Sequence, residues 1–321
     1  MFREENRYSI VVKVEPMPSE AHQDPDRRGP PPAIKSEILS MGRNFDEDII
    51  KKVIKLYLPL HKRSGQGAVK ITKDLKYGPD DRHRLDIHEP VTKLSGAMPT
   101  VVFFHGGAFV GGDKNVVGDF IFGNVATYFA RKGMLGVNAT YRLAPMHPWP
   151  QGALDVAGVV EWLRKYGAQY SGDPNRIFLF GHSAGAAHVA TYIFHEEFQL
   201  ESGAGVAGAI LMSVPCNPSA KQARSSDVAY YGPDTGKYAE RGAITHLDGL
   251  QVPLFVVSAE LDPPEFEMQS LELLEALRRL DKDHVRFATV KNHNHLSEVV
   301  HLNTGDDSIG PEIVDFIKTC P

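Results

Sequence analysis

The chain has 321 residues, of which 42% are hydrophobic and 23% are charged, so it contains enough apolar material for one large α/β domain or two smaller ones. Its formal net charge is −5 at pH 7, and its Lys and Arg residues are scattered rather than clustered, which argues against a nucleic-acid partner. The two cysteines, Cys216 and Cys320, are too few for a disulfide framework and lack metal-ligand spacing, so we expect two free thiols.

The N-terminus predicts no targeting or membrane segment. It begins with charged residues and lacks an apolar signal region, and no window approaches the roughly 20 apolar residues that a membrane span requires. We therefore expect a soluble, cytoplasmic protein. Residues 15–33 are rich in Pro and charge and cannot drive their own burial, so residues 1–40 are interpreted as an N-terminal extension.

Residues 41–67 form a second segment, which we expect to be a helical cap. Within it, the stretch NFDEDIIKKVIKLYLPLHKR has apolar residues at helical spacing. The spacing predicts an amphipathic helix over 45–58 that is stopped by Pro59.

From residue 68 to 321 the pattern alternates between short β-rich runs and helical stretches. This alternation is typical of crossover units on a mostly parallel sheet, and the short continuous apolar runs indicate strands that are buried on both faces. Eight strands are predicted, over 69–77, 83–88, 100–104, 135–139, 176–180, 208–212, 254–258 and 285–290. Flanking helices are predicted over 115–132, 151–167, 184–198, 265–280 and 310–319. Residues 214–248 interrupt the alternation with polar sequence and are interpreted as a small inserted cap.

The sharpest motif follows the predicted strand 176–180. It reads Gly181-His182-Ser183-Ala184-Gly185 and opens a helix of small residues. A serine on so tight a strand-to-helix turn has a strained backbone and stands exposed above the sheet, as a nucleophile must. The helix N-terminus also favours negative charge that develops on the reacting group. An ordinary glycine-rich turn is the alternative, but the strand before the motif and the helix after it favour the nucleophile.

A second glycine-rich loop follows the strand 100–104 and has the sequence HGGAFVGGD. Acyl transfer creates an oxyanion, and small residues let backbone N–H groups approach it closely. We assign an oxyanion hole to the N–H groups of Gly107, Ala108 and Ala184. A phosphate-binding loop is the alternative, but the Lys-Ser/Thr ending of a P-loop is missing. His105 is expected to brace this loop.

These motifs resemble the α/β-hydrolase fold and, within it, the hormone-sensitive-lipase-like esterases. The resemblance covers roughly residues 68–319. It rests on His105 to Phe109 in place of the family's His-Gly-Gly-Gly, on YRLAPMHPWP at 141–150, on GDPNRIFLFGHSAG at 172–185 and on SAELDPP at 258–264. Ala108 replaces the third glycine, which leaves binding through the backbone intact. The resemblance implies that residues 68–321 are an α/β-hydrolase catalytic domain.

The acid and the base should each follow a late strand, in the chain order Ser, acid, His. Both Glu260 and Asp262 follow the strand 254–258, and the family pattern, in which the acid stands just before Pro, selects Asp262. The family's base is the third residue after a loop glycine. Asn292 occupies that glycine's position, which selects His295.

Other histidines near the chain end remain alternatives for the base. His293 is expected to be too close to the strand end to reach the nucleophile, and His301 is expected farther out. The His293–His295 pair lacks a third ligand at recognisable spacing, so no metal is expected.

The resemblance implies a carboxylesterase-type serine hydrolase that needs no cofactor and acts on small uncharged esters with short or medium acyl chains. Phe109, Val110, Tyr230 and Tyr231, with the 45–58 helix, are candidates for the wall of an apolar pocket, and packing in the core is the alternative role for each. Protonation of the base should reduce activity as the pH falls through about 6 to 7.

Two other functions remain open. An amidase such as an arylformamidase, or a carbamate hydrolase, uses the same triad. A non-catalytic ligand-binding protein on the same fold is a rival of another class. Dimers are common in the resembling family, and the sequence leaves open whether this chain forms a homodimer.

Overall fold

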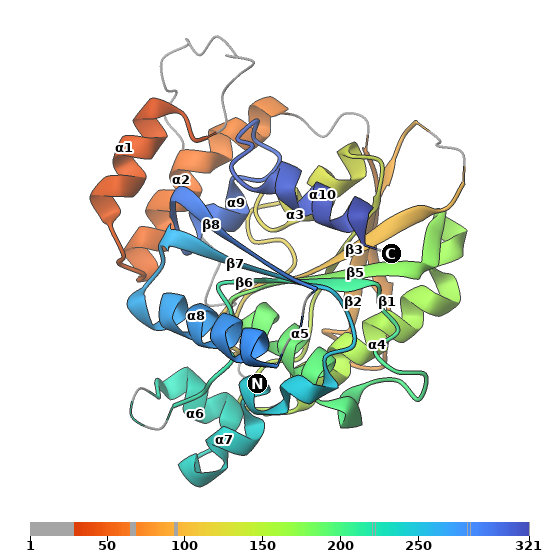
Figure 1. Cartoon of the computed structure of the whole chain (residues 1–321). Helices are drawn as coiled ribbons and strands as arrows, with labels where there is room; N and C mark the ends of the chain where they lie inside the picture. Colours follow the sequence, from red (N-terminus) through yellow and green to blue (C-terminus); the bar gives the residue numbers. More distant parts are fainter. Residues whose placement is uncertain are drawn as a thin grey trace, which may run out of the picture.

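A single eight-stranded sheet organises the molecule (Figure 1). The computed structural model describes residues 29–64, 69–92, 96–219, 221, 223–280, 282 and 284–320. The strands are β1 (Val69–Lys76), β2 (Arg84–Pro90), β3 (Met98–Phe104), β4 (Leu135–Ala139), β5 (Gly172–His182), β6 (Gly208–Met212), β7 (Leu254–Leu261) and β8 (Val285–Asn294). They lie in the order β1-β2-β4-β3-β5-β6-β7-β8, and β2 runs in the direction opposite to that of the other seven. The predicted mostly parallel sheet of eight strands is confirmed.

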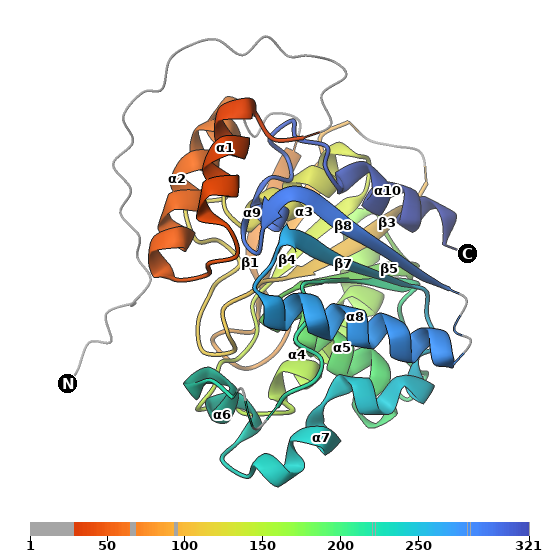
Figure 2. The ribbon, with the colours of Figure 1, turned by 60° about the vertical axis from the view of Figure 1, so that its left-hand side comes forward.

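Helices cover both faces of the sheet and make three layers (Figures 1 and 2). One face carries α4 (Gln151–Tyr166), α5 (Ala184–Phe194) and α8 (Pro264–Arg279). The other carries α1 (Pro32–Met41), α2 (Glu47–Ser64), α3 (Gly123–Arg131), α9 (Ser297–Val300) and α10 (Gly310–Thr319). No helix among the described residues combines the length and apolarity that crossing a bilayer demands.

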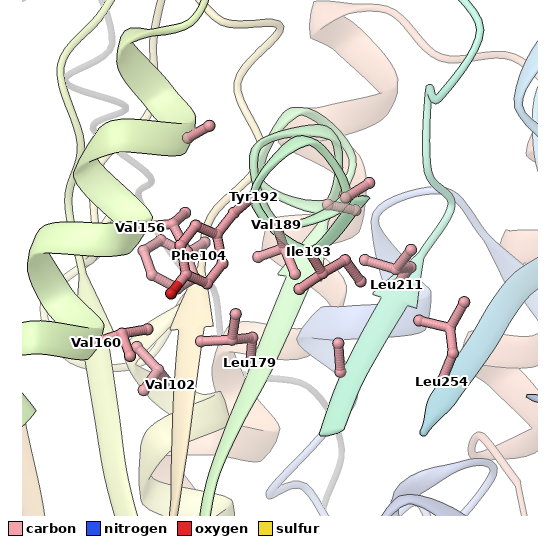
Figure 3. Close-up of a cluster of buried hydrophobic side chains, with 14 of the residues drawn as sticks. Val102, Phe104, Val156, Val160, Leu179, Val189, Tyr192, Ile193, Leu211 and Leu254 are labelled. Atoms are coloured by element: carbon pink, nitrogen blue, oxygen red, sulfur yellow. The ribbon is translucent and has the colours of Figure 1, made fainter. Parts of the chain in front are cut away.

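The strands are apolar throughout because each supplies side chains to two cores. In β3, Val102 and Phe104 pack on the face covered by α4 and α5, whereas Val101 and Phe103 pack on the opposite face. All four side chains are fully buried. Figure 3 shows how Val102 and Phe104 meet residues of α4 and α5 in the first of these cores. Strands buried on both faces lack polar alternation, which explains the continuous apolar runs of the sequence.

The N-terminal helices differ from the sequence-based expectation. Residues 1–28 of the expected extension lie outside the described residues, but its last part forms α1, which buries Ile34, Ile38 and Met41. The helix expected to stop at Pro59 continues to Ser64. A proline inside a helix removes one hydrogen bond, but here the burial of Leu58 and His61 on either side of it offsets that loss. The predicted start of α3 was eight residues early, because residues 115–122 form a loop.

The segment between β6 and β7 contains two short helices, α6 (Ser225–Tyr231) and α7 (Tyr238–Arg241). Both lie on the α8 side of the sheet (Figure 2). Three tyrosines of this segment, Tyr230, Tyr231 and Tyr238, pack with Phe109 in a small apolar cluster of their own. The inserted segment thus closes over the loop that follows β3.

Candidate active site

Ser183 stands on the sharp turn that connects β5 to α5. Its φ of 53° and ψ of −123° lie in a region of backbone conformation that residues other than glycine rarely adopt. The flanking glycines make the turn possible, since an added Cβ at Gly181 would lie 2.4 Å from Ala186 Cα and one at Gly185 would lie 2.1 Å from Phe104 O. Ser183 is only 8% exposed, so the residue is more buried than the exposed serine that the motif predicted.

The structure brings Ser183, His295 and Asp262 together. His295 Nε2 lies 3.0 Å from Ser183 Oγ, and His295 Nδ1 lies 2.8 Å from Asp262 Oδ1. The carboxylate of Asp262 is held by further donors on its other oxygen, where the Ala259 N–H donates to Oδ2 at 2.9 Å and the Ser213 hydroxyl lies 2.5 Å away. His295 and Asp262 are almost completely buried, which strengthens their interaction.

The alternative residues of the same two loops have other partners. His293 Nδ1 lies 3.1 Å from Ser297 Oγ, and its Nε2 lies 3.3 Å from Asp306 Oδ2. The Asn292 N–H donates to Glu260 Oε2 at 2.6 Å, so the carboxylate of Glu260 shapes the turn that precedes His295. Asn292 has a φ of 62°, and this left-handed conformation explains why a glycine-like residue is needed at that position.

The glycine-rich loop after β3 passes beside Ser183. An added Cβ at Gly106 would lie 3.2 Å from Ser183 Cβ, and the φ angles of Gly107 and Ala108 are 146° and 50°. Among the described residues, no backbone carbonyl accepts a hydrogen bond from the N–H of Gly107 or Ala108. Ala184 opens α5, where the first N–H groups lack partners inside the helix. These three N–H groups are therefore free to bind an anion.

His105 holds the glycine-rich loop from inside. Its Nδ1–H donates to Gly106 O at 2.7 Å, and the Tyr141 hydroxyl donates to His105 O at 2.7 Å. The two rings stack at 4.4 Å. Burial lowers the pKa of His105 to about 3, so the ring is neutral at physiological pH. Its role is to fix the loop.

Two aromatic side chains that the motifs did not predict enclose His295. The ring of Phe266, in α8, stacks on the imidazole at 4.3 Å, and the ring of Phe45 meets it edge-on at 4.4 Å. Arg43, in the same connection between α1 and α2 as Phe45, donates to Asp262 O at 3.0 Å. The N-terminal segment therefore covers His295 and contacts the loop that carries Asp262. The sequence indicated an amphipathic helix in this region, but that pattern does not identify the residues against which the segment packs.

A pocket of about 280 Å³ lies beside Phe109. Its walls are Phe109, Pro215, Asn217, Pro218, Ser219, Arg224, Asp227, Tyr231, Glu265 and Gln269. Two of the four residues predicted to line a pocket, Phe109 and Tyr231, are among them. Tyr230 stacks on Phe109 at 4.4 Å and hydrogen-bonds His188 Nδ1 at 3.0 Å, which makes it a support for the wall. Val110 packs against the apolar cluster that contains Phe109, Tyr230 and Tyr231.

Two groups of three buried residues, each with side chains of the kinds that can bind a metal ion, lie at or near this site. One contains His182, His295 and Glu298, and the other contains His293, His301 and Asp306; within each, the ligand atoms lie within 4.8 Å of one another. The two histidines of the His-x-His pair thus belong to different groups. In the second group His301 and Asp306 stand near His293, although the sequence spacing pointed to no third ligand.

Comparisons with known proteins agree with this architecture. A sequence model of the α/β-hydrolase fold family matches residues 101–297. Esterase LipC of Mycobacterium tuberculosis is 32% identical over 109 residues, which are 34% of this chain and 26% of that protein. Human bile salt-activated lipase is 31% identical over 136 residues, which are 37% of this chain and 18% of that protein. The chain thus matches about a quarter or less of the length of these two relatives.

Solved structures extend the similarity to most of the chain. Esterase B of Lactobacillus rhamnosis superimposes with a TM-score of 0.62 at 21% identity, covering 90% of this chain and 96% of that one. A bacterial heroin esterase gives a TM-score of 0.63 at 20% identity, covering 89% and 96%. Because the family match spans more than half of the residues and the fold agrees, the chain belongs to the α/β-hydrolase family, of the hormone-sensitive-lipase-like type that its motifs resemble.

Proposed function

We propose that the chain is a serine carboxylesterase that cleaves small uncharged esters with short or medium acyl chains. The observation that carries the proposal is the continuous contact from Ser183 Oγ to His295 and on to Asp262, with distances of 3.0 and 2.8 Å. Named esterases among the relatives support the same reaction class.

The geometry supports a two-step mechanism through an acyl-enzyme. His295 Nε2 takes the proton of Ser183 as Oγ forms a bond to the ester carbonyl carbon, and the carbonyl oxygen becomes an oxyanion. His295 then gives that proton to the leaving alcohol as its C–O bond breaks. A water molecule repeats the sequence, losing its proton to His295 and releasing the carboxylic acid and free Ser183.

Each remaining group has a defined role in the proposal. Asp262 accepts the Nδ1–H of His295, which leaves Nε2 as the base and stabilises the imidazolium ion. The N–H groups of Gly107, Ala108 and Ala184 would bind the oxyanion, at about 3 kcal/mol for each donor. Phe109 and Tyr231 would contact the acyl or alcohol group in the pocket of about 280 Å³.

Hydrolysis of an ester, amide and carbamate panel by the wild type and by Ser183→Ala tests the proposal. We expect the wild type to cleave p-nitrophenyl acetate and hexanoate, and the variant to lose about 10⁴-fold or more in kcat. Faster cleavage of an aryl formamide or carbamate would identify an amidase or carbamate hydrolase instead. Failure of a fluorophosphonate to label Ser183 would indicate a binding protein.

A further inference from the structure

A second buried carboxyl group lies beside the acid of the triad. Glu298, in α9, is fully buried, and its Oε1 is within hydrogen-bond distance of Ser213 Oγ. The same hydroxyl lies 2.5 Å from Asp262 Oδ2. Ser213 directly follows β6. Its hydroxyl therefore lies at the carboxyl end of a central strand, between two carboxyl groups that are both shielded from water.

The number of protons shared by Glu298, Ser213 and Asp262 limits how many of the two carboxyl groups can be ionised. A serine hydroxyl has one proton and donates to one oxygen at a time. If both acids were ionised, one anionic oxygen would face the lone pairs of Ser213 Oγ without a proton between them, at a site without solvent. The contact is satisfied when one acid carries a proton and donates it to Ser213 while Ser213 donates to the other.

The surroundings identify which acid is neutral. Asp262 accepts from His295 Nδ1–H at 2.8 Å and from the Ala259 N–H at 2.9 Å, which suits an ionised carboxylate. Glu298 Oε2 is buried without a hydrogen-bond partner among the described residues, and burying a neutral carbonyl oxygen in this way costs far less than burying an anion.

The titratable groups that face Glu298 are His182, His295 and Asp262. His182 Nε2 lies 3.4 Å from Glu298 Oε1, but it donates to His295 O at 2.7 Å, and burial lowers the pKa of His182, which keeps the ring neutral. Asp262 contributes a negative charge. Burial, with this charge as a second cause, raises the pKa of Glu298 well above its usual value.

We propose that Glu298 is a protonated acid and a positioning residue for the triad, acting through a relay in which Glu298 donates to Ser213 Oγ and Ser213 donates to Asp262 Oδ2. The relay fixes the rotation of the Asp262 carboxylate, so that Oδ1 stays directed at His295 Nδ1. Because Glu298 is neutral, Asp262 is the one negative charge of this pair beside His295. The role in positioning depends on the proposed hydrolase function, whereas the protonation of Glu298 does not.

Glu298→Gln tests the protonation state, since a glutamine amide can replace the neutral acid as donor to Ser213. We expect kcat/KM within about threefold of the wild type and an acid limb of the pH profile at the same pH. An ionised Glu298 predicts a different result, because removing an anion near His295 would move that limb to lower pH. Such a displacement would overturn the proposal.

Thermal unfolding gives a readout that is independent of activity. In the unfolded chain Glu298 is ionised near neutral pH, so a protein that folds with this acid protonated takes up a proton and loses stability as the pH rises. Glu298→Gln removes this proton uptake. The Tm of the variant minus that of the wild type should therefore increase between about pH 5 and about pH 8. Glu275→Gln, an exposed change on α8, is the matched control and should show no such growth. A gain that stays constant with pH would contradict a protonated Glu298.

Infrared difference spectra and Ser213→Ala complete the test. The C=O stretch of a protonated carboxyl group should be present in the wild type at neutral pH and absent from Glu298→Gln; its absence from the wild type would overturn the proposal. Ser213→Ala should lower kcat by about 10- to 100-fold with little change in KM, since a hydrogen bond to a charged group is lost. A folded Ser213→Ala enzyme with wild-type kcat would exclude the positioning role. If the wild type cleaves no ester, the proposed function fails, while the infrared and Tm results still determine the protonation of Glu298.

Discussion

His293 and His295 are two residues apart, yet their rings belong to separate hydrogen-bond networks. His295 lies between Ser183 and Asp262, whereas His293 pairs with Asp306 and Ser297. The left-handed conformation of Asn292, just before the pair, sets the path of the chain here. The imidazole of His295 therefore contacts both a hydroxyl and a carboxylate from other strand ends, whereas that of His293 contacts the loop that follows β8.

Replacing Asp262 by Asn tests the acid of the triad. The amide cannot accept the Nδ1–H of His295 as an anion does, so the neutral imidazole is no longer held in the tautomer that leaves Nε2 free. We expect kcat to fall by about 10⁴-fold, with Tm and KM changing much less. Glu260→Gln is the matched control in the same loop and should retain kcat within about tenfold. Equal losses in both variants would argue against Asp262 as the acid.

Substitution of Gly107 tests the oxyanion hole. A Cβ at Gly107 would lie 2.0 Å from Gly111 O, so alanine must displace the loop that presents the N–H groups. We expect Gly107→Ala to lower kcat by about 10²- to 10³-fold. Gly203→Ala is the control, because Gly203 also has a positive φ but an added Cβ there would contact nothing within 4 Å. Comparable kinetic losses in both variants would contradict the assignment.

The proposed carboxylesterase function includes a preference for short and medium acyl chains. Hydrolysis of p-nitrophenyl acetate, hexanoate and palmitate should decline steeply at palmitate. Tyr231→Ala enlarges the pocket and should raise the hexanoate-to-acetate ratio of kcat/KM by about tenfold. Tyr170→Ala, which alters an aromatic contact with Trp162 instead, should leave this ratio unchanged. A wild-type preference for palmitate would show that the pocket does not limit chain length.

Buried neutral histidines should make the protein acid-sensitive. The pKa values of five of them are lowered mainly by burial, to about 3 for His105 and His188 and to about 4 for His61, His88 and His301. Below about pH 6.5 the unfolded chain binds protons that the folded chain does not, so each such histidine lowers the free energy of unfolding by up to about 1.4 kcal/mol per pH unit. Urea titrations between about pH 7.5 and pH 5 measure this slope.

The variant His61→Asn isolates one contribution. It removes one titrating ring, which lies 2.8 Å from Val300 O, so the variant should lose stability overall but show a shallower pH slope than the wild type. An unchanged slope would mean that the folded protein protonates His61 as readily as the unfolded chain does.

The sequence predicted the sheet well because its strands are local patterns. The strands Leu135–Ala139 and Gly208–Met212 have the predicted bounds, and burial on both faces made their apolar runs continuous. The residues Ser183, Asp262 and His295 also lie where their motifs indicated, since each follows a strand that ends at the same edge of the sheet. The parallel arrangement brings these strand ends together.

The contacts of the N-terminal segment could not be read from the sequence. The apolar residues of α1, Ile34, Ile38 and Met41, are few and follow a proline-rich stretch, and only packing on the rest of the molecule makes a helix there. Phe45 contacts His295 across 250 residues of chain, and Ser213 and Glu298 meet through tertiary structure alone. No local pattern specifies such pairs.

The kinetics of His295→Ala beside His293→Ala test the central claim most directly. With p-nitrophenyl hexanoate as substrate and circular dichroism as the check of folding, His295→Ala should lose about 10⁴- to 10⁶-fold in kcat, similar to Ser183→Ala. His293→Ala should retain most of kcat and lose thermal stability, because its buried polar contacts with Asp306 and Ser297 are lost. A folded His295→Ala protein that keeps wild-type kcat, or a folded His293→Ala protein that loses it, would contradict the assignment of the base.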